Sequence, residues 1–454
     1  MTINFKSVKL AVALVAMVPM TSAYADDGQG GKLELTSSEQ QLADKNNAFA
    51  FRLFSEVSEE TSMVISPLSI TYALSMLNNG AAGETRQEIS DVLGFGEADL
   101  QAVNDLCHKV MTASSALDPL TQVSVANAVF LNKGYQLKPA FAETAQTYYD
   151  ATLESRDFAD GQTLDAINLW ASNHTNGAIP AIFDASEFDP TAASYLLNAT
   201  YFKGAWTQKF DPSNTQSEPF GDSGEQVDMM HMRTRMYYTS NGVFQALQMP
   251  YGNRSFNMTL LLPREDKTLG DVVASVSSKP WSKTLLSFGN NNVDIKLPRM
   301  DIGSRLLLEK ALNALGIRKA FERTADFSEF CEQSTHIDIV KQAAHLKMDE
   351  DGTEASAVTG IDSEPPSLEG EGSSVYNFHA NRPFLFVVSE ANSGLILFMG
   401  QYLGTGQTNA NATGIQSHRS LPVSEPTIHD LQGRRLSTLQ KGINIVDGRK
   451  VVVR

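Results

Sequence analysis

The sequence predicts an α+β fold, because helical and strand-like segments follow one another along the chain without a regular βαβ alternation. Three observations support this class. Apolar residues at helical spacing and clear helix starts lie in the first hundred residues, β-rich apolar runs lie in the middle, and hairpin patterns lie in the second half. The 454 residues, of which 42% are hydrophobic, allow one large domain or two.

The helices are predicted from their starts and ends. Residues 46–57 carry apolar side chains at helical spacing and predict an opening amphipathic helix. Ser66 before Pro67 predicts the start of a second helix, because serine caps free backbone N–H groups and proline is favoured at the first helical position. Thr85 and Glu88 form a capping box that predicts the start of a third. Two further helical segments are expected at residues 166–183 and 306–316.

The strands are predicted from β-rich composition and from alternation. Residues 123–131 and 194–202 are largely apolar, as expected of strands covered on both faces. Residues 293–297 alternate apolar and polar side chains, which is typical of a half-buried strand. Two hairpins are expected, one from segments 245–250 and 255–262, the other from segments 382–390 and 394–403.

Charge and the N-terminal segment restrict the class of function. The net charge of −16 argues against a nucleic-acid partner, because contacts to phosphates need a basic face. Lys6 and Lys9 precede an apolar run at residues 10–20, and residues 23–25, Ala-Tyr-Ala, form a small-x-small cleavage pattern. We therefore expect residues 1–25 to be a signal peptide, too short to span a membrane stably, and the mature protein to be secreted.

Motifs for catalysis, metals and cofactors are absent from the sequence. Cys107 and Cys331 are the only cysteines, so the chain is no disulfide scaffold, and the sequence leaves open whether they pair. His336 and His345 lack metal-ligand spacing. The string Gly-Asp-Ser-Gly at residues 221–224 occurs around the nucleophile of trypsin-like proteases, but here glutamate and glutamine follow it and no histidine lies in a recognisable context. We expect a polar turn there, no metal, no cofactor and no enzymatic activity.

The segment after Asp349 alternates with a period of two. Thr353, Ala355, Ala357 and Thr359 form a small, uncharged set, and the residues between them are mostly polar. This pattern is typical of a half-buried strand, whereas the prolines at 365–366 and the Gly/Ser composition up to residue 374 are typical of an exposed loop. The segment suits both a strand and a loop, and taken alone it also fits an ordinary acidic linker.

Motifs spread over the body resemble those of the serpin family, in the family's order. They are ISPLSITYALSMLNNGAAGETRQEI, LLNATYFKGAWTQKFDP, MPYGNRSFNMTLLLP, VDIKLPRMDI, ALGIRKAFERTADFS, MDEDGTEASAVT, FHANRPFLFVV and LILFMGQYL. The resemblance covers residues 40–404. It implies the serpin fold, which is α+β with three β-sheets, about eight or nine helices and an exposed reactive-centre loop.

The resemblance also assigns roles to individual residues. The hinge of the reactive-centre loop falls on Glu350, Gly352, Thr353, Ala355, Ser356, Ala357 and Thr359. The shutter, where the central strands part, falls on Ser66, Ser69, Asn198 and Gln342, and the breach, where the loop first enters the sheet, falls on Trp206. The family has histidine where this chain has Gln342. Because glutamine does not titrate, we expect shutter opening to be less sensitive to pH than a histidine would make it.

The function implied by the resemblance is suicide inhibition of serine proteases, with cysteine proteases as a wider target class. The protease forms an acyl-enzyme on the loop, and the freed hinge then inserts into the central sheet, a strand insertion for which serpins are a standard example. The hinge residues Thr353, Ala355 and Ala357 are small enough to enter without overpacking, and Gly352 gives the pivot backbone freedom. The alternative is a non-inhibitory serpin that acts as a binding or carrier protein.

The position of the scissile bond stays open. The family's usual interval from Glu350 places it at Pro366, but the loop is longer than in many members, and bonds before proline are poor substrates. We favour the bond Leu368–Glu369. The alternatives are Pro366, Ser367, Gly370, Glu371 and Gly372.

The charges of the loop and of one helical region restrict the class of protease and of polyanion that the chain is expected to bind. Residues 349–379 contain no lysine or arginine, so we expect an apolar- or glutamate-specific protease rather than a trypsin-like one. Residues 97–119 contain Lys109 as their only Lys or Arg, so no heparin-type site is expected. We expect a monomer.

The C-terminal segment differs from the body. Residues 405–427 have the composition of a linker, whereas residues 428–454 are basic and predict two or three small strands. This tail resembles C-terminal sorting modules of exported Bacteroidetes proteins. The resemblance implies an extracellular or cell-surface location on a Gram-negative bacterium, with the periplasm as an alternative. A small accessory β-hairpin is the other interpretation, and whether the tail is cleaved or anchors the protein stays open.

Overall fold

The computed structural model describes residues 31–96, 98–114, 116–353 and 374–405, together with four short strands between residues 428 and 453. The chain divides into two compact units, Met1–Ala412 and Thr413–Arg454. In the second unit the described strands form one antiparallel sheet in the order β17-β16-β18-β19. Their bounds are Ile428–His429 (β16), Arg435–Leu436 (β17), Gly442–Val446 (β18) and Arg449–Val453 (β19).

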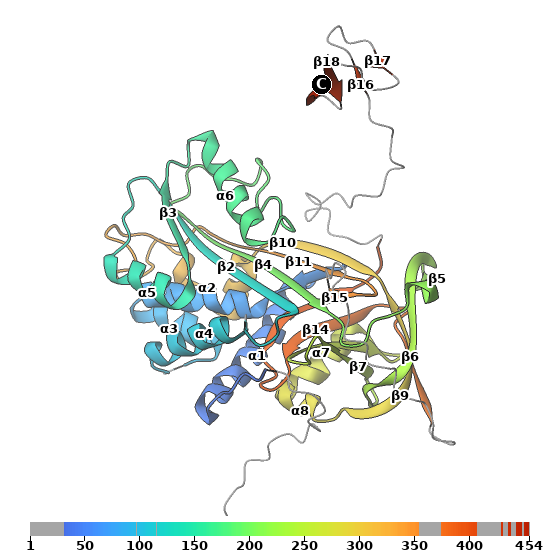
Figure 1. The fold of residues 1–454 in the computed structure, drawn as a ribbon. Coiled ribbons are helices and arrows are strands. Elements are labelled where there is room, and N and C mark those ends of the chain that lie inside the picture. Colours follow the sequence, from blue (N-terminus) through green and yellow to red (C-terminus); the bar gives the residue numbers. More distant parts are fainter. Residues whose placement is uncertain are drawn as a thin grey trace, which may run out of the picture. The chain divides into compact units, whose positions relative to one another are not determined.

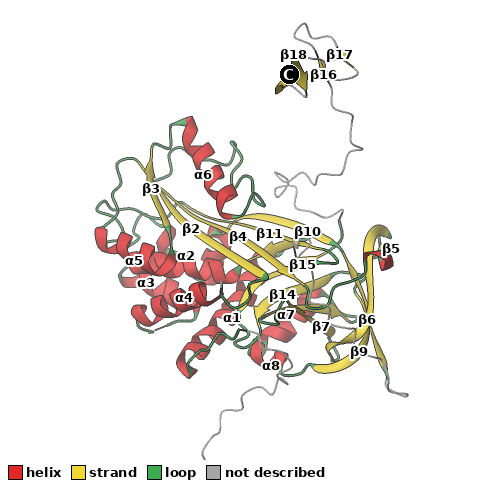
Figure 2. Cartoon of the chain, in the orientation of Figure 1, coloured by secondary structure: helices red, strands yellow, loops and turns green. Residues whose placement is uncertain are grey.

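Nine α-helices lie in the described part of the first unit, in agreement with the eight or nine expected. Figure 2 shows α2 to α5 gathered on one side of the strands β2 and β4, and α6 on the other side. The bounds are Ser37–Val57 (α1), Pro67–Gly80 (α2), Gly83–Leu93 (α3), Leu100–Ser114 (α4), Pro139–Tyr149 (α5), Gly161–His174 (α6), Leu269–Ser277 (α7), Trp281–Leu285 (α8) and Glu309–Leu315 (α9).

The first two helices begin at capped positions. Helix α1 starts before the predicted segment 46–57, because Thr36 and Glu39 form a capping box with reciprocal hydrogen bonds. The start of α2 is as predicted: the Ser66 side chain accepts a hydrogen bond from the backbone N–H of Ser69, and proline is the first helical residue.

The third helix does not begin at the predicted capping box, so that prediction is wrong. Helix α3 starts at Gly83, and Ala82 occupies the cap position without a side-chain cap. The hydroxyl of Thr85 accepts a hydrogen bond from the backbone N–H of Asp326 at 2.9 Å. The side chain that looked like a local cap therefore links α3 to a segment distant in sequence.

A mixed nine-stranded sheet has the order β1-β15-β14-β8-β7-β6-β9-β13, with β5 paired to β6. The long strand β6 pairs with both β7 and β9, so two of the three expected sheets are continuous with each other. Both predicted hairpins are present, as β7–β8 and β14–β15. The bounds are Met63–Ile65 (β1), Gln216–Phe220 (β5), Glu225–Ser240 (β6), Phe244–Tyr251 (β7), Phe256–Pro263 (β8), Gly289–Pro298 (β9), Val375–His379 (β13), Phe384–Glu390 (β14) and Ile396–Tyr402 (β15).

The second sheet has six strands in the order β10-β11-β12-β4-β2-β3 (Figure 1). Its bounds are Thr121–Asn132 (β2), Thr152–Arg156 (β3), Ser194–Ala205 (β4), Met300–Leu307 (β10), Ile339–Met348 (β11) and Gly352–Thr353 (β12). Strands β11 and β4 are parallel and pair directly from Ile339 opposite Tyr195 to His345 opposite Tyr201. We call this line of pairing the β4–β11 seam. Beyond its end, the two-residue strand β12 lies between β11 and β4.

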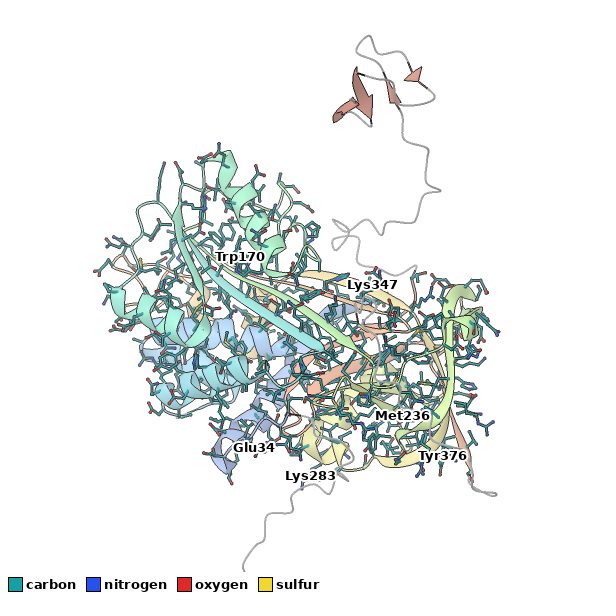
Figure 3. All side chains as sticks on the ribbon, viewed as in Figure 1. Glu34, Trp170, Met236, Lys283, Lys347 and Tyr376 are labelled. Carbon is teal, nitrogen blue, oxygen red and sulfur yellow. The ribbon has the colours of Figure 1, made fainter. Side chains whose placement is uncertain are left out.

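The six-stranded sheet is covered on both faces. The larger hydrophobic cluster of the unit consists mainly of buried residues from the helices and from the nine-stranded sheet. It also includes Leu196 and Val340, which lie on one face of the seam. A smaller cluster lies on the other face and includes Trp170 of α6, which is labelled in Figure 3. The Trp170 ring packs against Phe130 of β2, with ring centroids 6.1 Å apart. Both strands of the seam are therefore core strands.

The structure also shows the state of the two cysteines and the conformation of the Gly-Asp-Ser-Gly segment. Cys107 and Cys331 are buried and free, and burial raises the pKa of the Cys107 thiol to about 12, which makes it a poor nucleophile. Residues 221–224 form the turn between β5 and β6. Among the described residues, no helix is both long and apolar enough to cross a membrane, and no group of three His, Cys, Asp or Glu side chains is placed to hold a metal ion.

Candidate functional site

The first two residues of the predicted hinge after Asp351 form β12 and already lie in the six-stranded sheet. Thr353 pairs with Met348 of β11 and with Gly204 of β4, and Gly352 pairs with Ala205. The Thr353 side chain is fully buried, and its hydroxyl lies 2.7 Å from the hydroxyl of Tyr251. The segment that suited both a strand and a loop therefore begins as a strand at the mouth of the seam.

Gly352 occupies a position that only glycine fits. Its φ is +147°, and a Cβ atom there would lie 2.1 Å from the carbonyl oxygen of Gly204 and 2.7 Å from Cα of Ala205. Both contacts are with backbone atoms, which cannot swing aside as a side chain can. The glycine thus allows the chain to pass close to β4 where β12 begins.

Glu350, the first residue of the predicted hinge, anchors the chain just before β12. Glu350 is buried, with 5% of its surface exposed. Its carboxylate accepts hydrogen bonds from Nε and Nη2 of Arg299 at 2.7 to 3.0 Å and another from the hydroxyl of Thr215. Burial raises the pKa of Glu350, but the hydrogen bonds from Arg299 and Thr215 outweigh it, so the net pKa lies below the ordinary value. Because the folded pKa is lowered, this stabilisation is complete above the ordinary carboxyl pKa of about 4.3 and is lost as the pH falls through the lowered value.

Trp206 binds the backbone of the two residues that flank Glu350. Its indole Nε1 donates to the carbonyl of Asp349 at 3.0 Å, and its backbone N–H donates to the carbonyl of Asp351 at 2.9 Å. The indole stacks on Tyr251, with ring centroids 4.4 Å apart, and Lys209 pairs with the Asp351 carboxylate at 2.8 Å. The predicted breach residue therefore lies directly at the base of the hinge.

The four predicted shutter residues form one buried hydrogen-bonded cluster at the seam. Gln342 of β11 stands opposite Asn198 of β4, and its Nε2 lies 2.8 Å from the Asn198 Oδ1. The same Nε2 lies 2.8 Å from the Ser69 hydroxyl and 2.9 Å from the Ser66 carbonyl, while Oε1 accepts from the Ser66 N–H at 3.1 Å. Asn198 also donates to Oδ1 of Asn127 at 2.9 Å, so the cluster reaches β2. These bonds link β11, β4 and α2 across one face of the seam.

The Gln342→His variant should make thermal stability depend on pH. Gln342 accepts a hydrogen bond through Oε1 and donates through Nε2, and a neutral histidine can do both, whereas a protonated one can only donate. Burial favours the neutral form, so the folded pKa of the new histidine should lie below its unfolded value of about 6.5. Its stabilisation is then present above about pH 6.5 and is lost as the pH falls from there to the folded pKa. The expected loss is on the order of 1 kcal/mol for each tenfold difference in proton affinity between the folded and unfolded states.

Thermal melts of the variant and the unchanged protein at about pH 8 and pH 5.5 measure this effect. The melting temperature of the variant should fall more between the two conditions. Equal falls for the two proteins would show that position 342 does not control the pH response of the seam.

The remaining predicted site residues lie outside the described residues. They are the hinge residues Ala355, Ser356, Ala357 and Thr359, the favoured bond Leu368–Glu369, and the alternatives Pro366, Ser367, Gly370, Glu371 and Gly372. The described chain stops at Thr353 and resumes at Ser374, just before β13.

Residues that hold the hinge were missed by the sequence analysis. Arg299, Thr215 and Lys209 bind Glu350 or Asp351 from segments more than fifty residues away along the chain. Their side chains are common polar types in unremarkable local contexts, so the sequence contains no local signal for these contacts. Tyr251 was predicted only as part of a hairpin turn.

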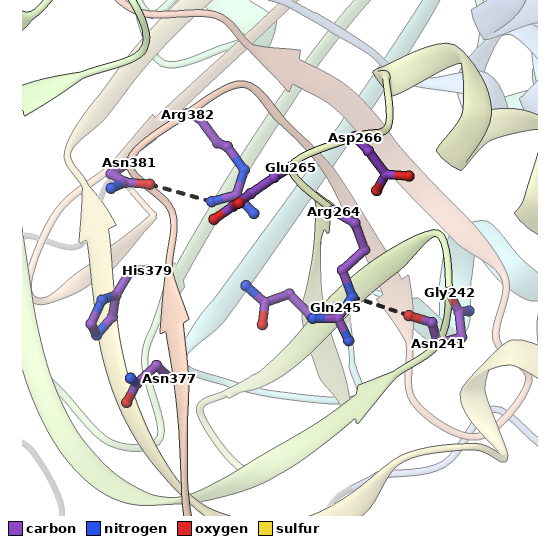
Figure 4. Close-up of a pocket in the computed structure, with 10 residues that line it drawn as sticks. All are labelled: Asn241, Gly242, Gln245, Arg264, Glu265, Asp266, Asn377, His379, Asn381 and Arg382. Carbon is purple, nitrogen blue, oxygen red and sulfur yellow. Dashed lines mark hydrogen bonds between the residues drawn. The ribbon is translucent and has the colours of Figure 1, made fainter.

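A polar pocket of about 760 Å³ lies near β13 and contains none of the predicted site residues (Figure 4). Arg264 and Arg382 share it with the carboxylates of Glu265 and Asp266. Burial lowers the pKa of Arg382, and Glu265 opposes that shift. Nε2 of His379, another lining residue, lies 2.8 Å from Asp294. The described lining residues include side chains of both charges, and none of them is a serine or a cysteine.

Comparisons with known proteins agree with this geometry. The sequence model of a family described as "Serpin (serine protease inhibitor)" matches residues 44–404. Serpin-Z2B of Triticum aestivum is 32% identical over 383 residues, which cover 78% of this chain and 93% of that protein. Iripin-8 of Ixodes ricinus is 28% identical, with coverage of 84% and 96%.

Solved structures show the same fold. The native state of the thermophilic serpin tengpin superposes with a TM-score of 0.74 at 23% identity, covering 82% of this chain and 96% of that one. Human thyroxine-binding globulin in complex with thyroxine superposes with a TM-score of 0.72 at 26% identity, with coverage of 82% and 100%.

Proposed function

The chain belongs to the serpin family, and from this premise we propose that it is a secreted suicide inhibitor of serine proteases, with cysteine proteases as a wider class of target. The protease nucleophile attacks a carbonyl in the loop between β12 and β13 and forms an acyl-enzyme, and the amine half of the cleaved loop leaves. The half that carries the protease then enters the sheet between β11 and β4 as a new strand. The protease is displaced with it and held before it can hydrolyse the acyl bond.

The observation that carries this proposal is the position of β12. Thr353 already pairs with both β11 and β4, and Gly352 pairs with β4, so the next hinge residues need only extend an existing strand. β12 is antiparallel to its neighbours β11 and β4, which suits a strand that enters from the end of the seam. The small side chains expected on the inward face do not oppose its extension.

The energy of such an insertion is comparable to the stability of a protease. About a dozen inserted residues bring about two dozen backbone groups into hydrogen bonds, and at roughly 1 kcal/mol each the upper bound is near 20 kcal/mol. A protease domain is stable by roughly 5–15 kcal/mol. Insertion can therefore supply enough free energy to distort the protease only if opening the seam costs little.

The experiment that tests the proposal mixes the mature protein with proteases of apolar, glutamate and basic specificity and resolves the products on a denaturing gel. A covalent complex that survives detergent is the expected result for an apolar- or glutamate-specific enzyme. Each protease pretreated with an active-site reagent serves as the control and should give no complex. If every active protease cleaves the loop and is released, inhibition is excluded.

The Leu368→Arg variant should gain inhibition of trypsin if Leu368 supplies the scissile carbonyl. Trypsin needs a basic residue at that position, and the unchanged loop has none from 349 to 379. A trypsin complex on the gel, together with loss of the complex with the original target, is the expected outcome. Ser367→Arg and Gly370→Arg are matched controls at neighbouring positions. A complex formed by one of these variants and not by Leu368→Arg would move the bond to that position.

A non-inhibitory binding function is the second candidate. It is favoured by the similarity to thyroxine-binding globulin, a serpin whose solved structure holds thyroxine. The gel assay separates the two candidates, because a carrier needs no covalent complex with a protease.

For location, we propose that residues 1–25 direct export and that the basic segment 428–454 is a sorting module of the mature protein. Mass spectrometry of the protein recovered from the medium and from washed cells checks both ends. The expected mature chain begins at residue 26, and recovery of the intact N-terminus from the cytoplasm would contradict export.

A further inference from the structure

The segment between α6 and β4, residues 175–193, covers the face of the seam that the shutter does not use. We call this segment the strap. Its buried residues Ile182 and Phe183 belong to one apolar cluster with Ala199 of β4 and Ala343 of β11, which stand opposite each other in register. Figure 1 shows α6, from which the strap continues, beside β2 and β4. The strap therefore lies over the line along which β4 and β11 must separate for a strand to enter.

A buried lysine of β11 binds the strap. Lys341 Nζ lies 3.0 Å from the Glu187 carboxylate and 4.3 Å from the ring centroid of Phe183. The Lys341 side chain is 1% exposed, whereas that of Glu187 is 30% exposed. Burial lowers the pKa of Lys341, and the Glu187 carboxylate opposes that shift. A charged group held inside the sheet in this way depends on its partner, because an unpaired buried charge is strongly destabilising.

A second ion pair binds the strap to the next strand. Arg305 of β10 donates from both terminal nitrogens to the Asp184 carboxylate at 3.1 and 2.9 Å. Near the start of β11, the Asp338 carboxylate accepts hydrogen bonds from the backbone N–H groups of Ala193 and Ser194 at 2.8 and 3.2 Å. Every one of these contacts joins the β4 side of the seam to the β10–β11 side.

These contacts oppose the opening of the seam because the strap is part of the same chain segment as β4. The strap is continuous with β4 at Ser194 and is tied to β11 and β10 through its acidic side chains. Moving β4 away from β11 must therefore either break the ion pairs or peel the strap from the sheet. The shutter cluster around Gln342 ties the opposite face of the same strands.

We propose that Lys341 and Arg305, paired with Glu187 and Asp184, form a latch that controls how fast the seam opens. The latch thereby sets the partition of the acyl-enzyme between trapping, which needs fast insertion, and hydrolysis, which releases active protease. These are positioning residues for the insertion step and do not touch the reacting bond. The inference rests on the proposed loop insertion.

The Lys341→Met variant tests the latch. Methionine keeps the length and the contact with Phe183 but removes the charge, and Glu187 is exposed enough to be hydrated when left alone. We expect insertion to be roughly tenfold faster, the size of a coupling in the middle of the range for contacting pairs. The measurement is the rate of the fluorescence change after loop cleavage at saturating protease, with Trp206 at the hinge as the reporter. The stoichiometry of inhibition should fall, and spontaneous insertion of the uncleaved loop should become faster.

Lys133→Met is the control for removing a more exposed ion pair elsewhere in the sheet. Lys133 forms an ion pair with Asp157 in the same sheet, at the ends of β2 and β3 and away from the seam. This variant should insert at the unchanged rate. Glu187→Gln, which leaves Lys341 unpaired, should speed insertion like Lys341→Met, and the double variant should show non-additive effects.

Free energies of unfolding separate a latch from an ordinary stabilising pair. If the pair is broken while the seam opens, a variant should lower the activation free energy of insertion by about as much as it lowers the free energy of unfolding. The ratio of these two changes should then be near one. A ratio near zero for Lys341→Met would mean that the pair survives insertion, and the latch would be overturned. If the unchanged protein is cleaved and shows no insertion, inhibition and the latch are both overturned, whereas unchanged rates in the variants overturn the latch alone.

Discussion

Replacing Thr353 with arginine will abolish inhibition while leaving the loop cleavable. The Thr353 side chain is fully buried between β11 and β4 and bonded to Tyr251, so an arginine there must lie unpaired inside the sheet or keep the hinge out of it. An unpaired buried charge costs about 3 kcal/mol or more, which corresponds to about a hundredfold slower insertion. At that rate the acyl-enzyme is hydrolysed first, and the protein becomes a substrate.

The denaturing gel measures this outcome as loss of the covalent complex with full cleavage of the loop. Glu354→Arg is the matched control, because the period of two in the sequence places residue 354 on the face opposite to Thr353. That variant should still form the complex. If Thr353→Arg traps its target at the unchanged stoichiometry, β12 is not the leading end of an inserting strand.

Cleavage of the loop will raise the melting temperature of the body by an amount on the order of tens of degrees. The inserted strand would contribute up to about 20 kcal/mol of hydrogen bonding, and each kcal/mol shifts the melting temperature of a large domain by roughly 2–4 °C or somewhat less. The inserted strand replaces the direct β4–β11 ladder with two ladders, one on each side of itself, so the sheet gains backbone hydrogen bonds on balance. Calorimetry before and after limited proteolysis in residues 354–373 checks this expectation.

Two controls make the melting experiment specific to insertion. Thr353→Arg cleaved at the same bond should melt close to its uncleaved form. Cleavage in the linker at residues 405–427 should leave the melting temperature of the body unchanged, because that segment follows the last strand of the body, β15. An unchanged melting temperature after loop cleavage of the natural sequence would contradict insertion and favour the carrier function.

Features with a local physical cause were predictable from the sequence. The start of α2 follows from the cap at Ser66, and the β7–β8 and β14–β15 hairpins follow from apolar runs around short polar turns. The two-fold alternation after Asp349 also predicted a segment compatible with a strand. These features depend on residues within a few positions of each other, where propensity and periodicity apply.

Strand β11 shows the opposite case. Its central residues are Lys341, Gln342 and two alanines, a composition that is not typical of a strand buried on both faces. The strand is in the core because Glu187 pairs with the lysine on one face and the shutter cluster satisfies the glutamine on the other. Both partners lie more than a hundred residues away, so no local pattern could identify them.

Thr85 shows how the same limit produces an error. A threonine three residues before a glutamate is a good local cap, but Asp326 provides the threonine with a partner from another segment, and α3 begins earlier. Capping preference is worth about 1 kcal/mol, which a tertiary contact can easily exceed.

The sequence by itself determined the α+β class and the family, and it predicted the position of the hinge, because these inferences depend on motifs and on short-range periodicity. Only the tertiary structure decided that Gly352 and Thr353 already lie in the sheet, that Arg299 and Trp206 hold the base of the hinge, and that both faces of the seam are tied. Buried charges and amides are stable only with partners of the right geometry, and folding brings those partners from distant parts of the chain.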